Sequence, residues 1–183
     1  MLLGRLVSSS TTALNLLFYR IFLFVLFIVS GFRYEVGCDW NNYTLLFNYV
    51  SSVGLAVMAI QGEISFVAVN NIVKYFGLPF TYVNVICSFI FFYGFNILAK
   101  RQKDPLTFLI LAFPVLIIGL PMSGVRQAAA VGILCIAFIS FIDKKIFRYI
   151  FLVFLATTFH SSAFLFLALA PFIKTGISFK RIF

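Results

Sequence analysis

The chain carries little charge, and negative charge is especially scarce. Only 10% of its 183 residues are charged, and five Asp or Glu stand against 14 Lys or Arg. Hydrophobic residues make up 63% of the chain, and the mean hydropathy is +1.10. So few polar groups would not cover the surface of a soluble domain of this length. The composition therefore excludes a soluble fold and indicates a polytopic membrane protein.

Residues that build metal centres and disulfide frameworks are also scarce. The chain has one histidine and three widely separated cysteines, Cys38, Cys87 and Cys135. With so few histidines and cysteines, we predict no metal site, no cofactor and no disulfide framework. The net charge of +9 lies in small basic clusters between apolar runs, as orientation signals do. We therefore expect no nucleic-acid partner.

The apolar runs approach the length that a helix needs to cross about 30 Å of hydrocarbon. They are too uniform for barrel strands, which alternate. We predict an all-α, polytopic transmembrane helical bundle of about five to seven full or partial membrane segments, forming one integral membrane domain over residues 1–183. The clear spans are 13–30, 80–99, 106–120 and 127–142. Pro114 is expected to kink the span 106–120.

Two regions leave alternatives open. Residues 49–76 are moderately apolar but include several polar side chains, and they form either a poor span or an interfacial helix. Residues 146–159 and 163–173 are each too short to span. They form either one long span with His160 at its centre or a shallow hairpin with His160 at its tip.

Three basic clusters, 100–103, 144–148 and 174–181, predict the orientation. The positive-inside rule places all three in the cytoplasm. This holds if span 80–99 runs inward, span 106–120 runs outward and span 127–142 runs inward. Residues 146–173 must then form a hairpin. If the N-terminus with Arg5 is also inside, residues 33–39 lie outside, and segment 49–76 then crosses an even number of times or not at all. The residues gathered at the outer face are Arg33, Glu35, Asp39, Glu63, Arg126 and His160.

Arg126 is the only charged residue between Asp104 and Asp143. The break at 121–124 places it, with Gln127, at the tip of a helical hairpin at the membrane edge. An arginine there needs an anionic partner, and arginine binds phosphate through two parallel hydrogen bonds. Arg33, Arg126 and Gln127 are therefore candidate substrate-binding residues. The alternative makes Arg33 a solvated loop residue and Arg126 an interfacial anchor.

Asp39, Glu63 and His160 are the candidate catalytic residues. His160 lies among hydroxyl side chains and suits a proton donor or a phosphate partner. A carboxylate suits a general base that acts on an acceptor hydroxyl. The alternatives are a structural histidine and carboxylates that balance Arg33.

Four short motifs resemble those of the EpsG family of Wzy-like polysaccharide polymerases, and they occur in the same order. Residues 32–43, Phe-Arg-Tyr-Glu-Val-Gly-Cys-Asp-Trp-Asn-Asn-Tyr, resemble its R-x-x-x-G-T-D-Y-x-x-Y loop. Glu63 followed by Phe66 resembles its next acidic motif. Residues 125–130, Val-Arg-Gln-Ala-Ala-Ala, resemble its R-Q-x-x-A start of a span, and residues 159–163, Phe-His-Ser-Ser-Ala, its H-x-S-A motif.

The chain departs from these motifs at three positions. Cys38 stands where threonine is usual, and Ile64 and Ser65 stand where the acidic motif has its glycine. Family members are usually longer, with more spans after the histidine motif. The resemblance therefore implies a truncated N-terminal portion, incomplete at the C-terminus.

The resemblance implies a multi-pass protein of the inner (cytoplasmic) membrane that makes exopolysaccharide or O-antigen. The reaction would join undecaprenyl-pyrophosphate-linked repeat units by glycosyl transfer on the outer face, without a metal. Arg33, Arg126 and His160 would stabilise the pyrophosphate, and Asp39 or Glu63 would activate the acceptor.

The implied partners are the undecaprenyl-pyrophosphate-linked oligosaccharide, membrane lipids and other polysaccharide-assembly membrane proteins. The alternatives are a lipid-linked-sugar transporter or flippase component, and a non-catalytic truncated membrane protein.

Overall fold

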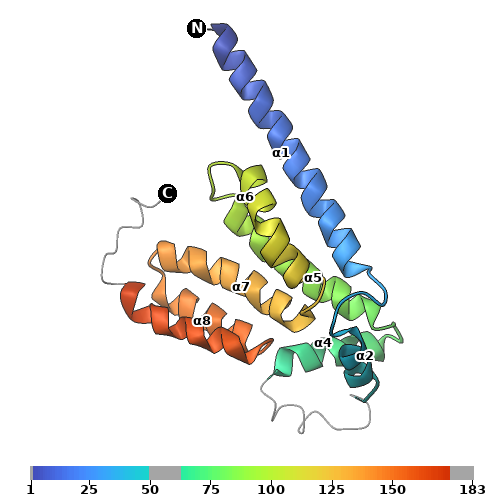
Figure 1. Ribbon diagram of the computed structural model, residues 1–183. Helices are drawn as coiled ribbons and strands as arrows, with labels where there is room; N and C mark the ends of the chain where they lie inside the picture. The colour runs from blue at the N-terminus through green and yellow to red at the C-terminus, as the bar shows by residue number, and fades with distance from the viewer. Residues whose placement is uncertain (1, 50–62, 174–183) are drawn as a thin grey trace.

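The computed structural model describes residues 2–49 and 63–173, with side chains from residue 13 onward. Every regular element in these residues is a helix (Figure 1). In chain order the elements are α1 (Leu2–Gly31), α2 (Trp40–Tyr49), α4 (Ile64–Tyr75), α5 (Thr81–Ala99), α6 (Pro105–Ala112), the π-helical segment η1 (Phe113–Ile117), α7 (Val125–Ile142), α8 (Ile146–Thr157) and the 3-10 helix η2 (Ser161–Ile173). The predicted all-α bundle is confirmed.

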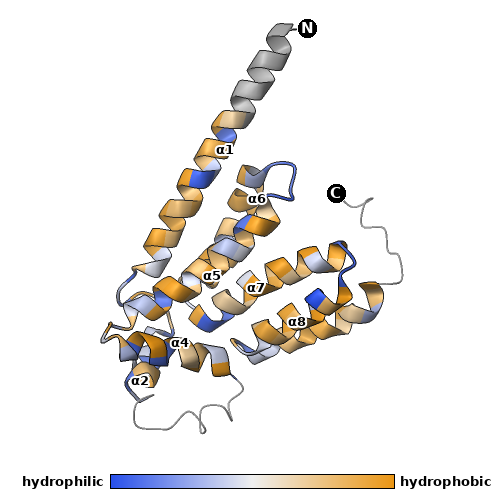
Figure 2. Ribbon diagram, turned by 180° about the vertical axis from the view of Figure 1, so that it is seen from behind, coloured by the Kyte–Doolittle hydropathy of each residue, from blue (hydrophilic) through white to orange (hydrophobic). Residues whose placement is uncertain are grey.

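Three of the described helices are long and apolar enough to cross a membrane: Ala13–Gly31, Thr81–Ala99 and Val125–Ile142. They match the predicted spans 13–30, 80–99 and 127–142 closely. The shorter apolar helices are Pro105–Ile117, Ile146–Thr157 and Ser161–Ile173. Figure 2 shows apolar residues along these helices and hydrophilic ones mainly near their ends.

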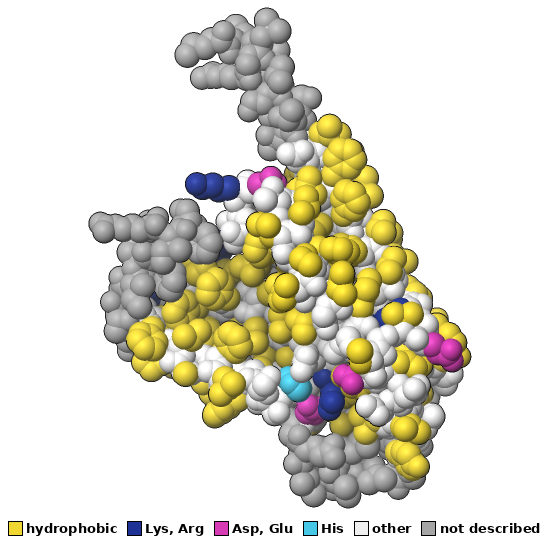
Figure 3. Space-filling model, in the orientation of Figure 1, with side chains coloured by type: hydrophobic (Ala, Val, Ile, Leu, Met, Phe, Trp, Pro, Cys, Tyr) yellow, Lys and Arg dark blue, Asp and Glu magenta, His cyan; other side chains and the backbone are white. Residues whose placement is uncertain are grey.

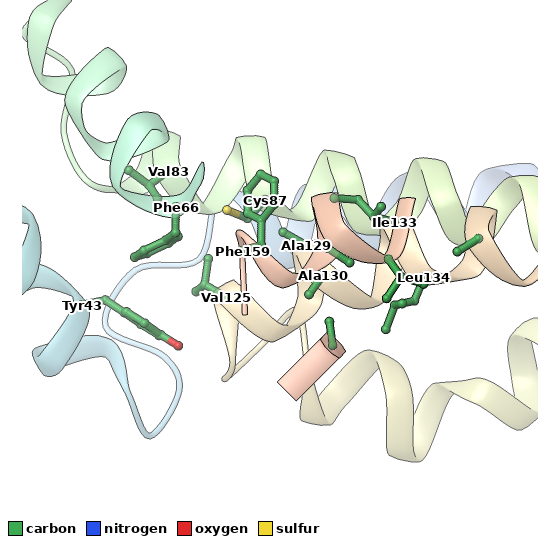
Figure 4. Close-up of a cluster of buried hydrophobic side chains, with 14 of the residues drawn as sticks. Tyr43, Phe66, Val83, Cys87, Val125, Ala129, Ala130, Ile133, Leu134 and Phe159 are labelled. Carbon is green, nitrogen blue, oxygen red and sulfur yellow. The ribbon is translucent and has the colours of Figure 1, made fainter. Parts of the chain in front are cut away.

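The centre of the bundle is the crossing of α5 and α7, where two glycines let the backbones touch. A Cβ atom on Gly94 would lie 1.8 Å from the Gly132 carbonyl oxygen, and one on Gly132 would lie 2.5 Å from the Phe91 Cα. Small residues bring membrane helices into such close contact. The main buried cluster of side chains lies beside this crossing, and its labelled members in Figure 4 include Cys87, Ala129 and Phe159.

The peripheral helices surround this pair unequally. Helix α1 packs against α5, and α8 and η2 pack against α7. Only 11% of the membrane-spanning part of α1 is buried inside the protein, against 61% for that of α7. Helix α1 therefore turns most of its apolar surface outward, as a lipid-facing helix does, whereas α7 is a core helix.

The break at 121–124 is a turn, as predicted, and Arg126 lies at the start of the helix that follows it. Helix α6 packs mainly against α1 and α5, while the main neighbours of α7 are α5, α8 and η2. The glycine crossing gives α7 a closer neighbour in α5 than in the helix that precedes it in the chain. Pro114 lies in the π-helical segment η1. Proline lacks the N–H that would continue the α-helical ladder, so the helix changes its hydrogen-bond register there.

The C-terminal pieces form a hairpin. Helices α8 and η2 pack against each other, and the Tyr149 hydroxyl donates a hydrogen bond to the Phe166 carbonyl. The hairpin interpretation of 146–173 is confirmed, and the single long span is wrong. His160 lies in the turn between the two helices.

Of the ambiguous segment 49–76, the described part is essentially α4. Its 12 residues span about 18 Å, short of the hydrocarbon thickness. Residues 50–62 lie outside the described residues. Figure 1 shows α2 and α4 together at one end of the bundle.

Candidate functional site at the Arg126 end of the bundle

Most charged residues that the structure describes lie near the two ends of the helices. At one end, the Arg101 Nη2 lies 3.3 Å from the Asp143 Oδ2, and the Lys145 Nζ lies 3.7 Å from the same oxygen. Clusters 100–103 and 144–148 therefore meet at the ends of α5 and α7, as the charge pattern predicts. Arg126 lies at the opposite end of α7. Cluster 174–181 lies outside the described residues.

Glu63 is the centre of the site at the Arg126 end. Its Oε2 pairs with the Arg126 guanidinium, and its Oε1 lies 3.0 Å from the His160 Nδ1. Glu63 is 9% exposed, so its charge depends on these two partners for compensation. The three residues lie immediately before α4, in the first turn of α7 and between α8 and η2. Figure 3 shows the chain's one histidine, in cyan, beside basic and acidic side chains on the surface.

Gln127 touches the other nitrogen of the imidazole. Its Nε2 lies 3.3 Å from the His160 Nε2. An amide nitrogen only donates, so the His160 Nε2 accepts and Nδ1 carries the proton that is donated to Glu63. This arrangement favours the tautomer that has its proton on Nδ1 and a lone pair on the outer nitrogen Nε2.

Two aromatic rings hold the Arg126 guanidinium. The Arg126 Cζ lies 5.2 Å from the Tyr43 ring centroid and 5.8 Å from that of Phe66, both within cation–π range. The Tyr43 hydroxyl also interacts electrostatically with the Arg126 guanidinium. Burial raises the pKa of Tyr43, so this hydroxyl stays protonated at neutral pH.

Sequence reasoning missed these roles of Tyr43 and Phe66. A signal was present, because Tyr43 closes the motif 32–43 and Phe66 closes the motif that begins at Glu63.

Arg126 occupies an unfavourable place on its helix. It is the second residue of α7, whose preceding residue Gly124 provides no side-chain cap. The partial positive charge of a helix N-terminus disfavours a cation and favours an anion. The Glu63 carboxylate therefore compensates both the Arg126 charge and the helix end.

Arg33 lies beside this cluster rather than in it. Its Nη1 donates to the Pro121 carbonyl, and the residue is 7% exposed. Gly37, at φ 108°, packs so closely on the same turn that a Cβ would lie 2.3 Å from the Met122 oxygen. Burial lowers the pKa of Arg33 to about 10, against the opposing effects of Tyr43 and Cys87. Arg33 thus holds loop 32–39 against the turn that precedes Arg126.

Asp39 is half-buried and lies just before α2. Its carbonyl accepts a hydrogen bond from the Tyr43 N–H at 3.0 Å. Its carboxylate is close enough to Tyr43 to act on that hydroxyl electrostatically. The structure therefore places Asp39 at the edge of the cluster, one helical turn from Tyr43.

Two of the residues that meet here, Glu63 and His160, are of types that bind metals. Among the described residues, no group of three or more His, Cys, Asp or Glu could hold a metal ion. The donors that the site presents are guanidinium, amide and imidazole groups. Such groups suit an anion and a proton transfer.

Long apolar helices with a partly buried ionic cluster at one end define a polytopic helical membrane protein with a polar site at the end of its helices. The match to a family model makes the identification specific: the chain belongs to the EpsG family, whose model covers residues 16–183. This membership supports a polymerase-like role in membrane polysaccharide assembly. Neither a curated protein nor a solved structure matches the chain.

Proposed function

We propose that the protein polymerises polysaccharide repeat units by glycosyl transfer from undecaprenyl pyrophosphate at the outer face of the inner membrane. The observation that carries this proposal is the double pairing of Glu63 with Arg126 and His160. It joins a phosphate-binding side chain to a proton-accepting one. Both suit glycosyl transfer from a pyrophosphate, which needs charge stabilisation on the leaving group and removal of a proton from the acceptor.

The proposed step is a displacement at the anomeric carbon. The bond from that carbon to the pyrophosphate oxygen breaks, and the acceptor hydroxyl oxygen forms a new bond to it. The hydroxyl proton passes to the His160 Nε2, and lipid pyrophosphate leaves as an oxyanion. Gln127, whose side chain is exposed, vacates Nε2 when the acceptor binds.

This assignment moves the role of general base from a carboxylate to His160. Both oxygens of Glu63 already have partners, the Arg126 guanidinium and the His160 Nδ1. Glu63 then orients the imidazole and stabilises the imidazolium that forms, as the carboxylate does in a Ser-His-Asp triad. We assign Asp39, at the edge of the cluster, to the acceptor sugar.

The hydrogen-bonding capacity left on the two arginines favours an anionic ligand. The Nε atoms of both arginines are buried without a hydrogen-bond partner among the described residues. A pyrophosphate would use this capacity, and the low local dielectric would strengthen the interaction. We propose that Arg126, Arg33 and Gln127 contact it.

The charges at the two ends of the helix bundle indicate how the protein is oriented in the membrane. If the Arg101–Asp143 end is cytoplasmic, as its basic clusters favour, the Glu63 cluster faces outward. A flippase would instead need charges along a path at depth. Among the residues that the structure describes, Arg20 on α1 is the charge within a long span away from either end, and it is exposed on the helix surface.

The test compares two arginines that each form an ion pair. Arg126→Ala in a polymerase-null strain should abolish long chains, whereas Arg101→Ala, at the other end of the bundle, should leave the polymer ladder intact. Protein levels are matched by immunoblotting. A normal ladder from Arg126→Ala would return Arg126 to the role of an interfacial anchor and overturn the proposal.

A further inference from the structure

We propose that Ser65 and Thr158 form a clasp that positions Glu63 against His160, and that both are positioning residues for the proposed reaction. The inference rests on the proposed function only for its effect on turnover. Its effect on the imidazole is independent of any activity.

Two hydrogen bonds make the clasp. The Ser65 N–H donates to the Thr158 carbonyl at 3.0 Å, and the Ser65 Oγ lies 2.7 Å from the Thr158 Oγ1. The Thr158 hydroxyl donates to the Leu155 carbonyl at 2.6 Å. Its proton is thus already used, so the Ser65 hydroxyl is the donor in the side-chain bond.

The backbone bond joins two helix ends that need partners. Ser65 lies in the first turn of α4, where N–H groups have no acceptor within the helix. Thr158 follows the last residue of α8, where carbonyl groups have no donor. Each end satisfies the other, and the positive end of one helix dipole meets the negative end of the other.

The clasp lies next to both members of the carboxylate–imidazole pair. Glu63 precedes Ser65 by two residues, and His160 follows Thr158 by two. The pair itself is 3.0 Å long, and a displacement of about 1 Å would break it as a hydrogen bond. Ser65 is also a position at which the chain departs from the motif that it resembles, so this hydroxyl contact is a feature of the chain's own sequence.

The structure contains a matched control. Thr157 is adjacent to Thr158, but its hydroxyl donates to the Val153 carbonyl at 2.9 Å, within its own helix. Thr157→Val therefore removes a hydroxyl of the same kind at the next position without touching α4. Ser65→Thr keeps the hydroxyl and serves as the conservative variant.

The primary measurement uses the chain's single histidine. In the whole chain in lipid nanodiscs, 15N shifts of the His160 ring report which nitrogen carries the proton. Wild type, Thr157→Val and Ser65→Thr should show the Nδ1-protonated form. Ser65→Ala and Thr158→Val should shift the population toward the Nε2-protonated form, which predominates in free histidine.

Turnover is the second measurement. Ser65→Ala should lower kcat about threefold to tenfold, the effect of losing one hydrogen bond, and leave KM nearly unchanged. An unchanged tautomer in both Ser65→Ala and Thr158→Val would overturn the clasp, whatever the activity. The expected tautomer shift in a wild-type protein that makes no polymer would support the clasp and refute the proposed function instead.

Discussion

Glu63 and His160 are 97 residues apart in the chain, yet the Oε1 of one lies 3.0 Å from the Nδ1 of the other. The same carboxylate pairs with Arg126 through its second oxygen. Three segments that hydropathy alone would treat as separate membrane elements therefore share one ionic cluster. Each prediction below changes one contact of this cluster or of the helices that hold it.

Glu63→Gln should lower the free energy of unfolding by about 1–3 kcal/mol, because it leaves the partly buried Arg126 without its anion. Thermal unfolding in detergent measures the loss. In the double variant with Arg126→Gln, much of the stability should return while polymer formation does not. Additive losses in the double variant would show that the two charges do not interact.

Tyr43→Phe and Tyr43→Leu separate the two contacts that Tyr43 makes with Arg126. Phenylalanine keeps the ring and loses the interaction of the hydroxyl with the guanidinium, so we expect a loss of about 0.5–1.5 kcal/mol. Leucine also loses the cation–π contact and should cost more, by about 0.5–1 kcal/mol. The unfolding temperatures of the two variants measure the difference. Equal temperatures would show that the cation–π contact does not stabilise the protein.

Gly132→Ala should weaken the α5–α7 crossing, because the new Cβ would meet the Ile90 oxygen and the Phe91 Cα at 2.5 Å. We expect a loss of about 1–3 kcal/mol, typical of overpacking. Gly119→Ala is the control, since a Cβ there meets nothing within 4 Å. Comparison of monodisperse yield and unfolding temperature tests the pair. A neutral Gly132→Ala would mean that the helices separate easily at this point.

Asp104 at the start of α6 should make stability depend on pH. Its carboxylate accepts from the Thr107 hydroxyl at 2.7 Å and the Leu106 N–H at 3.0 Å, and the Thr107 bond is the main cause that lowers the pKa of Asp104. The ionised carboxylate contributes its full stabilisation above the pKa of an unfolded carboxyl group, about 4. That stabilisation is lost as the pH falls through the lower pKa of Asp104 in the folded protein.

Asp104→Ala should therefore reduce stability by about 0.5–1 kcal/mol near neutral pH and by less at pH 3. Asp104→Asn, which can still cap the helix, should lose little at either pH. Unfolding curves at the two pH values make the comparison. An equal deficit for Asp104→Ala at both would exclude the ionised cap.

Labelling in whole cells tests the orientation. In a cysteine-free background, Ser161→Cys should react with a membrane-impermeant maleimide, and Lys103→Cys should react only after permeabilisation. The opposite pattern would place the Glu63 cluster in the cytoplasm, where the proposed outer-face reaction does not occur.

Hydropathy predicted the membrane helices well, since length and apolar content alone decide whether a helix can span. Charge bias also favoured the C-terminal hairpin correctly, because only a hairpin returns the chain to the basic end. The contacts inside the site were beyond a single sequence. Nothing local to Glu63 shows that its carboxylate meets Arg126 and His160.

The neighbours of α7 could not be predicted for a similar reason. Helix α7 follows α6 in the chain but packs on α5, because Gly94 and Gly132 permit a closer approach than chain order suggests. Such complementarity appears only when two surfaces are placed together. The buried role of Arg33 depends in the same way on the Pro121 carbonyl.

The Gly94–Gly132 contact also has a mechanical consequence. Where two backbones touch, no layer of side chains can yield, so α5 and α7 resist sliding past each other. They act as one stiff body that carries Arg126 at one end and Arg101 near the other. His160 lies on the α8–η2 hairpin, so the packing of that hairpin on α7 sets the gap between the cation and the imidazole.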